Sequence, residues 1–144
     1  MSDWSDYAVA RLQKQREDER MKDQKFLEQQ RIKKAFGLPL WLELRRLAID
    51  NVIAFNSKVS TNMLAFEATE DTQLNIHSKM PGNPRRLLVS FDDEVSRLSW
   101  ECGTKSGQWD VAATDDGGVR FEWGTTATTP ASIVEQMLDA LLFD

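Results

Sequence analysis

Apolar residues recur along the chain with two different periods, and the change of period predicts where helices give way to strands. Between residues 39 and 56 they recur every three or four positions, as on the buried face of an amphipathic helix. After Ser57 the period falls to two and stays there as far as Gly124, which predicts strands with alternate side chains on opposite faces. Six such segments, separated by polar turns, fit this pattern.

The N-terminal region has a weaker apolar pattern but a strong preference for helix. Residues 5–36 contain no proline or glycine and are rich in Gln, Lys, Arg, Glu and Ala, so we expect one long helix there. Between residues 13 and 25 the one apolar side chain is Met21, so this part has no face suited to a core. Gly37 and Pro39 are typical of a helix end and of a first helical turn, which predicts a break before a second helix begins.

The predicted elements follow the order α-α-β6-α and specify an α+β fold. Because short polar turns join neighbouring strands, we expect a six-stranded antiparallel meander. One face of the sheet is apolar, and two helices, Pro39–Asn56 and Thr129–Phe143, are expected to cover it. The chain then divides into a charged N-terminal helix, residues 1–36, that serves as an appendage or oligomerisation arm, and an α+β globular domain, residues 38–144.

Charge is distributed unevenly along the chain. Residues 11–34 hold nine Lys or Arg and five Asp or Glu, a net charge of +4, whereas residues 35–144 hold nine and sixteen, a net charge of −7. A basic helix on an acidic body favours docking to an anionic partner or to a second copy. The candidate partner-binding residues are Arg11, Lys14, Arg16, Arg20, Lys22 and Lys25. We expect a homo-oligomer, with a dimer as the commonest closed form, or a complex with another protein through this helix.

Length and composition restrict the class of protein. With 144 residues, 41% of them hydrophobic, the chain is long enough to bury one core. It has no run of about 18 apolar residues, so no membrane span is expected, and residues 1–15 lack the apolar centre of a signal peptide. Cys102 is the single cysteine, which excludes an intrachain disulfide and argues against secretion. We therefore expect a cytoplasmic protein.

Three tryptophans are predicted to lie in one row across neighbouring strands. If Cys102 pairs with Gly107, then Trp100 faces Trp109, and the next hairpin places Trp109 opposite Trp123. One interpretation is that the row is core, since aromatic cross-strand pairs commonly stabilise sheets. The other is a partly open wall for an apolar or aromatic ligand.

Other candidates for chemistry have simpler structural interpretations. Asp92–Glu94 and Asp115–Asp116 fall on predicted hairpin tips, where aspartate caps turns, and neither has the ligand spacing of a calcium loop. His77 is expected on the polar face of the sheet without a nucleophile or metal ligands beside it. The glycines after residue 100 lie in hairpins, so no phosphate-binding loop is predicted. No catalytic residue, metal site or cofactor is expected.

The sequence favours a binding function over an enzymatic one. We expect a non-enzymatic protein-interaction or self-association module that acts through its N-terminal helix. The alternative is a small-molecule carrier with a cavity between sheet and helices and the tryptophan row in its wall. An enzyme comes third because no catalytic set is present, and the acidic body argues against nucleic acid as a partner.

Overall fold

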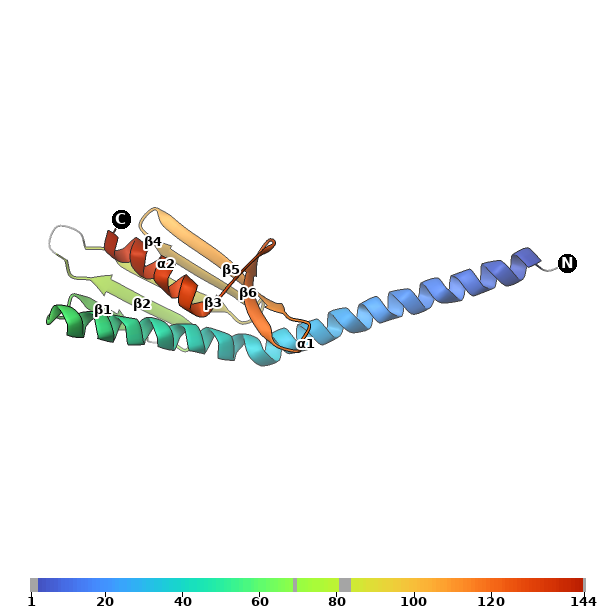
Figure 1. Cartoon of the computed structure of the whole chain (residues 1–144), viewed down its shortest axis with the longest axis horizontal. Helices are drawn as coiled ribbons and strands as arrows, with labels where there is room; N and C mark the ends of the chain where they lie inside the picture. Colours follow the sequence, from blue (N-terminus) through green and yellow to red (C-terminus); the bar gives the residue numbers. More distant parts are fainter. Residues whose placement is uncertain (1–2, 69, 81–83, 144) are drawn as a thin grey trace. The chain divides into compact units, whose positions relative to one another are not determined.

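The computed structural model describes residues 3–68, 70–80 and 84–143 and shows an α+β protein, as predicted. The elements, in chain order, are α1 (Asp3–Val59), β1 (Leu64–Glu67), β2 (Gln73–Ser78), β3 (Arg86–Asp92), β4 (Arg97–Cys102), β5 (Lys105–Ala113), β6 (Val119–Trp123), β7 (Thr126–Thr128) and α2 (Pro130–Phe143) (Figure 1). The predicted count of six strands is wrong by one. Strand β7 was missed because its three residues, Thr, Ala and Thr, carry no apolar alternation.

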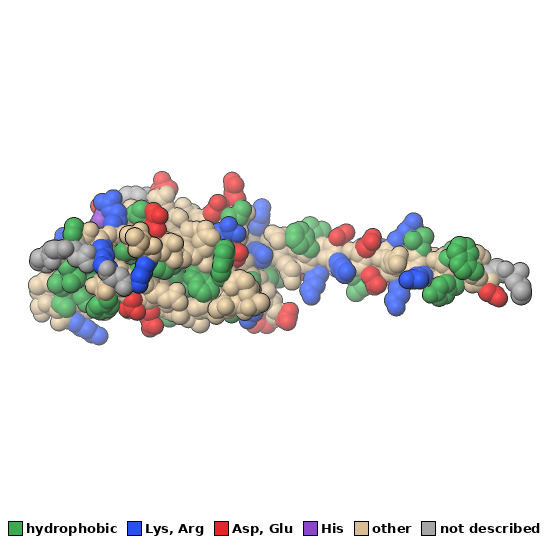
Figure 2. All heavy atoms as spheres, turned by 90° about the horizontal axis from the view of Figure 1, so that it is seen from above, with side chains coloured by type: hydrophobic (Ala, Val, Ile, Leu, Met, Phe, Trp, Pro, Cys, Tyr) green, Lys and Arg blue, Asp and Glu red, His purple; other side chains and the backbone are tan. Residues whose placement is uncertain are grey.

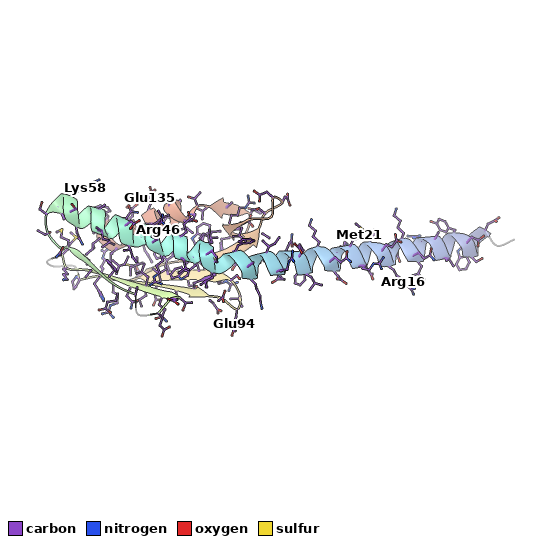
Figure 3. All side chains as sticks on the ribbon, turned by 90° about the horizontal axis from the view of Figure 1, so that it is seen from below. Arg16, Met21, Arg46, Lys58, Glu94 and Glu135 are labelled. Atoms are coloured by element: carbon purple, nitrogen blue, oxygen red, sulfur yellow. The ribbon has the colours of Figure 1, made fainter. Side chains whose placement is uncertain are left out.

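The strands form one sheet in which each strand pairs with its neighbours along the chain. Their order is β1-β2-β3-β4-β5-β6-β7, and every pair is antiparallel. This confirms the meander that the short polar turns predicted. Helix α2 and the C-terminal part of α1 lie on the same face of the sheet (Figure 1; Figure 3).

The buried core lies between that face and the two helices. Along β3 and β4 every second residue is buried, as a period of two requires, which confirms the predicted apolar face. From the sheet the buried apolar residues are Leu64, Leu74, Ile76, Leu87, Val89, Phe91, Leu98, Trp100, Cys102, Val111 and Phe121. From the helices they are Trp41, Leu44, Ala48, Val52, Ile133, Val134, Met137, Ala140 and Leu141. The helical members are spaced by one, three or four residues, so they form one stripe on each helix.

Helix α1 is continuous, so the predicted break between two helices at Gly37 is wrong. Gly37 is buried where the helix approaches the sheet, and a Cβ there would lie 3.6 Å from both Phe91 Cζ and Ser96 Oγ. Pro39 is exposed inside the helix, where its fixed φ suits the helix but its missing N–H costs one hydrogen bond. We attribute the continuity to the core-facing residues that follow, whose burial outweighs the local preference for a helix end.

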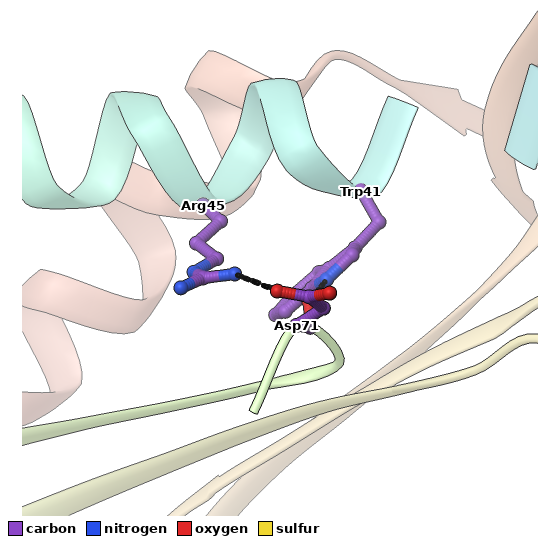
Figure 4. A network of polar contacts seen from close by, with 3 residues as sticks. All are labelled: Trp41, Arg45 and Asp71. Atoms are coloured by element: carbon purple, nitrogen blue, oxygen red, sulfur yellow. Dashed lines mark hydrogen bonds and ion pairs between the residues drawn. The ribbon is translucent and has the colours of Figure 1, made fainter. Parts of the chain in front are cut away.

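Trp41 joins α1 to the turn between β1 and β2. It is fully buried, and its indole Nε1 donates a hydrogen bond to the backbone carbonyl of Asp71 at 2.6 Å. Arg45 Nη1 donates to the same carbonyl at 3.2 Å and lies 4.0 Å from the Asp71 carboxylate (Figure 4). The ring of Phe91 stacks on Trp41 with centroids 6.0 Å apart. One side chain therefore holds the helix against two parts of the sheet.

The chain forms two compact units, Met1–Arg31 and Ile32–Asp144. The described part of the first unit is the beginning of α1, and nearly all of its side chains are exposed. Arg16 and Met21, for example, project away from the helix (Figure 3), and apolar and charged side chains are interspersed along this segment (Figure 2). Its exposed large apolar residues are Trp4, Tyr7, Val9, Leu12, Met21, Phe26 and Leu27. Over the described residues, neither helix has the length and apolar character needed to cross a membrane.

Candidate functional site

The hairpin between β4 and β5 is tighter than the apolar pattern predicted. A two-residue turn that begins at Gly103, with φ of +62°, joins the two strands. Trp100 therefore pairs with Gly107, and the predicted pairing of Trp100 with Trp109 is wrong. Glycine at the first position is typical of two-residue turns whose twist matches that of the strands. The shift amounts to two residues, so every side chain stays on its predicted face.

The ladder between β5 and β6 is shorter than the ladder between β5 and β4. Strand β6 has the predicted register, with Val111 opposite Phe121, but the last pair of this ladder is Asp110 with Glu122, so the ladder does not include the predicted pairing of Trp109 with Trp123. Strand β4, by contrast, pairs with β5 as far back as Lys105. In the part of the chain that the structure describes, Ser106–Trp109 therefore have a strand partner on one side only. We call these four residues the free edge of β5.

The backbone groups at the free edge have a defined direction. Val111 donates its N–H to the carbonyl of Ser96, on the β4 side, at 2.9 Å. Along an antiparallel strand, successive residues direct their N–H and C=O groups to opposite sides. Counting back from Val111, the N–H and C=O groups of Ser106 and Gln108 point away from β4. Two donors and two acceptors are thus available at this edge for another strand.

A groove of about 840 Å³ follows the free edge of β5. Its walls come from β3, β4 and β5, from the end of β6 at Trp123, from the start of β7 at Thr126, and from α2. Trp100, Trp109 and Trp123 all contribute to it, so we call it the tryptophan groove. Among its described lining residues, Glu101 carries the one charge. The volume lies in the range of about 300 to 1,000 Å³ that is usual for ligand sites.

The three tryptophans differ in burial. Trp100 is 8% exposed, Trp109 is half-buried and packs against the core, and Trp123 is 47% exposed. The indole Nε1 of Trp100 is buried without a hydrogen-bond partner in the described structure. It lies against Gly107, where a Cβ would come within 2.7 Å of Trp100 Cε2. The three side chains, which do not form the predicted row of paired residues, thus range from the buried Trp100 to the accessible ring of Trp123.

A charged pair positions Trp123 at the rim of the groove. Arg97 Nε donates a hydrogen bond to Asp110 Oδ1 at 2.7 Å, and the guanidinium carbon lies 5.8 Å from the centroid of the Trp123 ring. The hydrogen bond to Asp110 and the charge of that carboxylate raise the pKa of Arg97. Each side chain of the pair is 42% exposed, so solvent screens the attraction and the pair contributes little to the stability of the fold.

No protein-family model, curated protein or solved structure matches this chain.

The six basic residues predicted to bind a partner lie on α1, within the first compact unit. All are exposed, as contact with a partner requires. They are Arg11, Lys14, Arg16, Arg20, Lys22 and Lys25. They are separate in sequence from the tryptophan groove, whose lining residues all belong to the second unit. The chain therefore carries two candidate binding surfaces of different chemistry.

The aspartates at the hairpin tips act in turns, as predicted. Asp92 Oδ1 accepts the backbone N–H of Glu94 at 3.0 Å. Asp116 Oδ1 accepts the Thr114 hydroxyl and, at 3.2 Å, the backbone N–H of Gly118. These two hydrogen bonds, that from Thr114 first, hold the pKa of Asp116 below its usual range. Both carboxylates are thus committed to their own turns.

His77 and the neighbouring arginines also have structural partners. His77 Nδ1 accepts a hydrogen bond from Arg86 Nε at 3.1 Å across β2 and β3. Arg85 Nη1 donates to the carbonyl of Ala140 in α2 at 2.9 Å, which satisfies an acceptor near the end of that helix. The described residues include no cluster of three or more side chains suited to a metal ion.

The sequence pattern predicts the three tryptophans but not the free edge of β5 that runs beside them. Nothing in the apolar pattern marks the point at which β6 leaves β5. One signal was available in Gly107, because a glycine inside a strand often marks a close approach of other atoms. Here those atoms are the ring of Trp100.

Proposed function

We propose that this protein is a non-enzymatic interaction module that self-associates through residues 3–31 of α1. The observation that carries the proposal is the exposure of large apolar side chains on a helical segment that forms its own compact unit. Trp4 is 78% exposed, and Phe26 is 59% exposed. Aromatic side chains of this kind are enriched at protein interfaces, where their burial drives association.

The charge distribution supports association between copies of the same chain. Residues 11–25, in the middle of the segment, hold six Lys or Arg and four Asp or Glu, a net charge of +2, and residues 35–144 have a net charge of −7. A coiled coil along the whole segment is disfavoured because residues 13–25 contain Met21 as their one apolar residue. The proposed contact instead buries the apolar ends of the segment and places its basic middle against the acidic surface of a second copy.

Light scattering on the full-length protein across a salt series tests this proposal. We expect a dimer at low salt that dissociates as salt is raised, because the screening length falls from about 10 Å at 0.1 M to about 3 Å at 1 M. Arg16→Glu combined with Arg20→Glu should weaken the dimer at low salt, and Trp4→Ser combined with Tyr7→Ser should weaken it at every salt concentration. Lys58→Glu and Phe143→Ser, which change exposed residues outside the segment, are the matched controls. A monomer throughout at high micromolar concentration would refute the proposal.

A second candidate function is the binding of an apolar or aromatic ligand in the tryptophan groove. It is favoured by the three tryptophans that share one groove and by the partly exposed ring of Trp123, which is free to stack on a ligand. Nile red, a neutral apolar dye, serves as the probe because it avoids repulsion by Glu101. Its emission should rise with wild-type protein and with Phe143→Ala but not with Trp123→Ala. Equal emission with both variants would exclude the groove as the binding site.

A further inference from the structure

We propose that the tryptophan groove is a docking site for an extended polypeptide segment, which adds a strand to the free edge of β5. The inference rests on the proposed ligand-binding function of the groove and names the class of ligand. It is carried by one juxtaposition, an unpaired strand edge that lies along a groove with aromatic walls.

The backbone groups of the free edge favour a polypeptide over a small apolar molecule. Ser106 and Gln108 direct two N–H and two C=O groups away from β4, as the hydrogen bond of Val111 establishes. A small apolar ligand would leave these four groups to water. An extended peptide pairs with all of them, and main-chain hydrogen bonds of this kind provide the affinity in strand addition.

The two faces of the groove specify the side chains of the added strand. Trp109 lies on the apolar face of β5, whereas Ser106 and Gln108 lie on its polar face, beside Ser99 and Glu101 of β4. Alternate side chains of a strand point to opposite faces, so every second residue of the peptide meets the tryptophans. The bound segment therefore alternates apolar or aromatic residues with polar ones.

The negative charge of the groove surface restricts which peptides can bind. Glu101 is the charged residue of the described groove lining, and residues 35–144 have a net charge of −7. An acidic segment would be repelled by this surface, and a lysine or arginine on the polar face of the added strand would lie close to Glu101. We infer that the occupant is a neutral to basic, alternating, extended segment.

The experiment starts by selecting short random linear peptides on immobilised full-length protein, with Trp123→Ala protein as the counter-selection. Enrichment of alternating apolar and polar or basic peptides is the expected result. Synthetic versions of the enriched peptides are then titrated against the protein. A selection that enriches nothing over Trp123→Ala, or that enriches acidic peptides without alternation, overturns the inference.

The Gln108→Pro variant tests the backbone pairing directly. It removes an N–H that points away from β4 and leaves the ladder with β4 intact, and proline is tolerated at strand edges with this geometry. Gln108→Ala removes the side chain, retains the N–H, and is the matched control. We expect the proline variant to bind the selected peptide about tenfold more weakly, because it loses one hydrogen bond to the peptide backbone. Equal affinity of the two variants would contradict strand addition.

A second measurement leaves the protein unaltered and covers the case in which Gln108→Pro does not fold. Single N-methylation of the selected peptide removes one backbone donor at a time and should weaken binding at alternate positions only. Uniform tolerance of N-methylation overturns the inference. Nile red binding separates the two proposals, since dye binding without peptide binding refutes only the peptide, and absence of both refutes the ligand-binding function of the groove as well.

Discussion

Replacement of Trp41 by alanine is expected to lower the free energy of unfolding by about 3 to 5 kcal/mol, the usual cost of truncating a fully buried large aromatic residue. Trp41 has no exposed surface, stacks on Phe91 and donates its indole hydrogen to the carbonyl of Asp71. A small domain is stabilised by only about 5 to 15 kcal/mol in total, so this loss is a large share of its stability. Urea unfolding followed by far-UV circular dichroism measures it.

Two further tryptophan variants provide comparisons, one at the same position and one in the tryptophan groove. Trp41→Phe keeps a ring against Phe91 but removes the donor to Asp71, and it should cost about 1 to 2 kcal/mol. Trp123→Ala changes a ring that is 47% exposed, and it should cost less than about 1 kcal/mol. If Trp41→Ala cost no more than Trp123→Ala, the contact between α1 and the turn before β2 would not hold the helix on the sheet.

Replacement of Gly107 by alanine is expected to lower the free energy of unfolding by about 1 to 3 kcal/mol, the range seen when extra atoms are forced into a packed site. A Cβ at this position would overlap the indole nitrogen of Trp100 and lie 2.7 Å from its Cε2. Gly107 pairs with Trp100 in the ladder between β4 and β5. The added methyl group would therefore displace the Trp100 ring while the strands stay paired. Urea unfolding measures the loss, and a red shift of tryptophan emission would show that Trp100 has been displaced.

Gly37→Ala is the matched control, because the same substitution is expected to act with the opposite sign. A Cβ at Gly37 meets Phe91 and Ser96 at 3.6 Å, an ordinary contact distance, and alanine is favoured over glycine inside a helix by about 1 kcal/mol. The variant should therefore be as stable as the wild type or more stable. A Gly107→Ala protein of unchanged stability would mean that Trp100 is not held over the strand.

The candidate surfaces could be predicted from the sequence in part. The exposed apolar and basic residues of the N-terminal segment follow from their order alone, because a helix with charges on every side has no face to bury. Alternation with polar residues predicts that one face of the sheet carries all three groove tryptophans, Trp100, Trp109 and Trp123. It does not predict their unequal burial, since Trp109 is half-buried and Trp123 is exposed.

The order of apolar residues along the chain predicts most of the core-facing positions, because side-chain direction along a strand or helix follows the local period. The same reasoning could not decide the register of β4 against β5. A shift of two residues leaves every side chain on the same face, so the apolar pattern is identical in both registers. The positive φ of Gly103 and the packing of the Trp100 ring against Gly107 decide between them, and both belong to the folded hairpin.

The continuity of α1 and the free edge of β5 also depend on contacts that the apolar pattern does not record. Gly37 and Pro39 favour a helix end locally, but burial of Gly37 against β3 and the adjoining turn is a contact between segments far apart in the chain. The free edge of β5 arises because β6 ends at Trp123 and the chain turns back at Gly124 into β7, a strand without the apolar alternation that would reveal this turn. Periodicity records the environment of each side chain, whereas register, helix continuity and strand separation depend on contacts between distant segments, which a pattern along one chain does not contain.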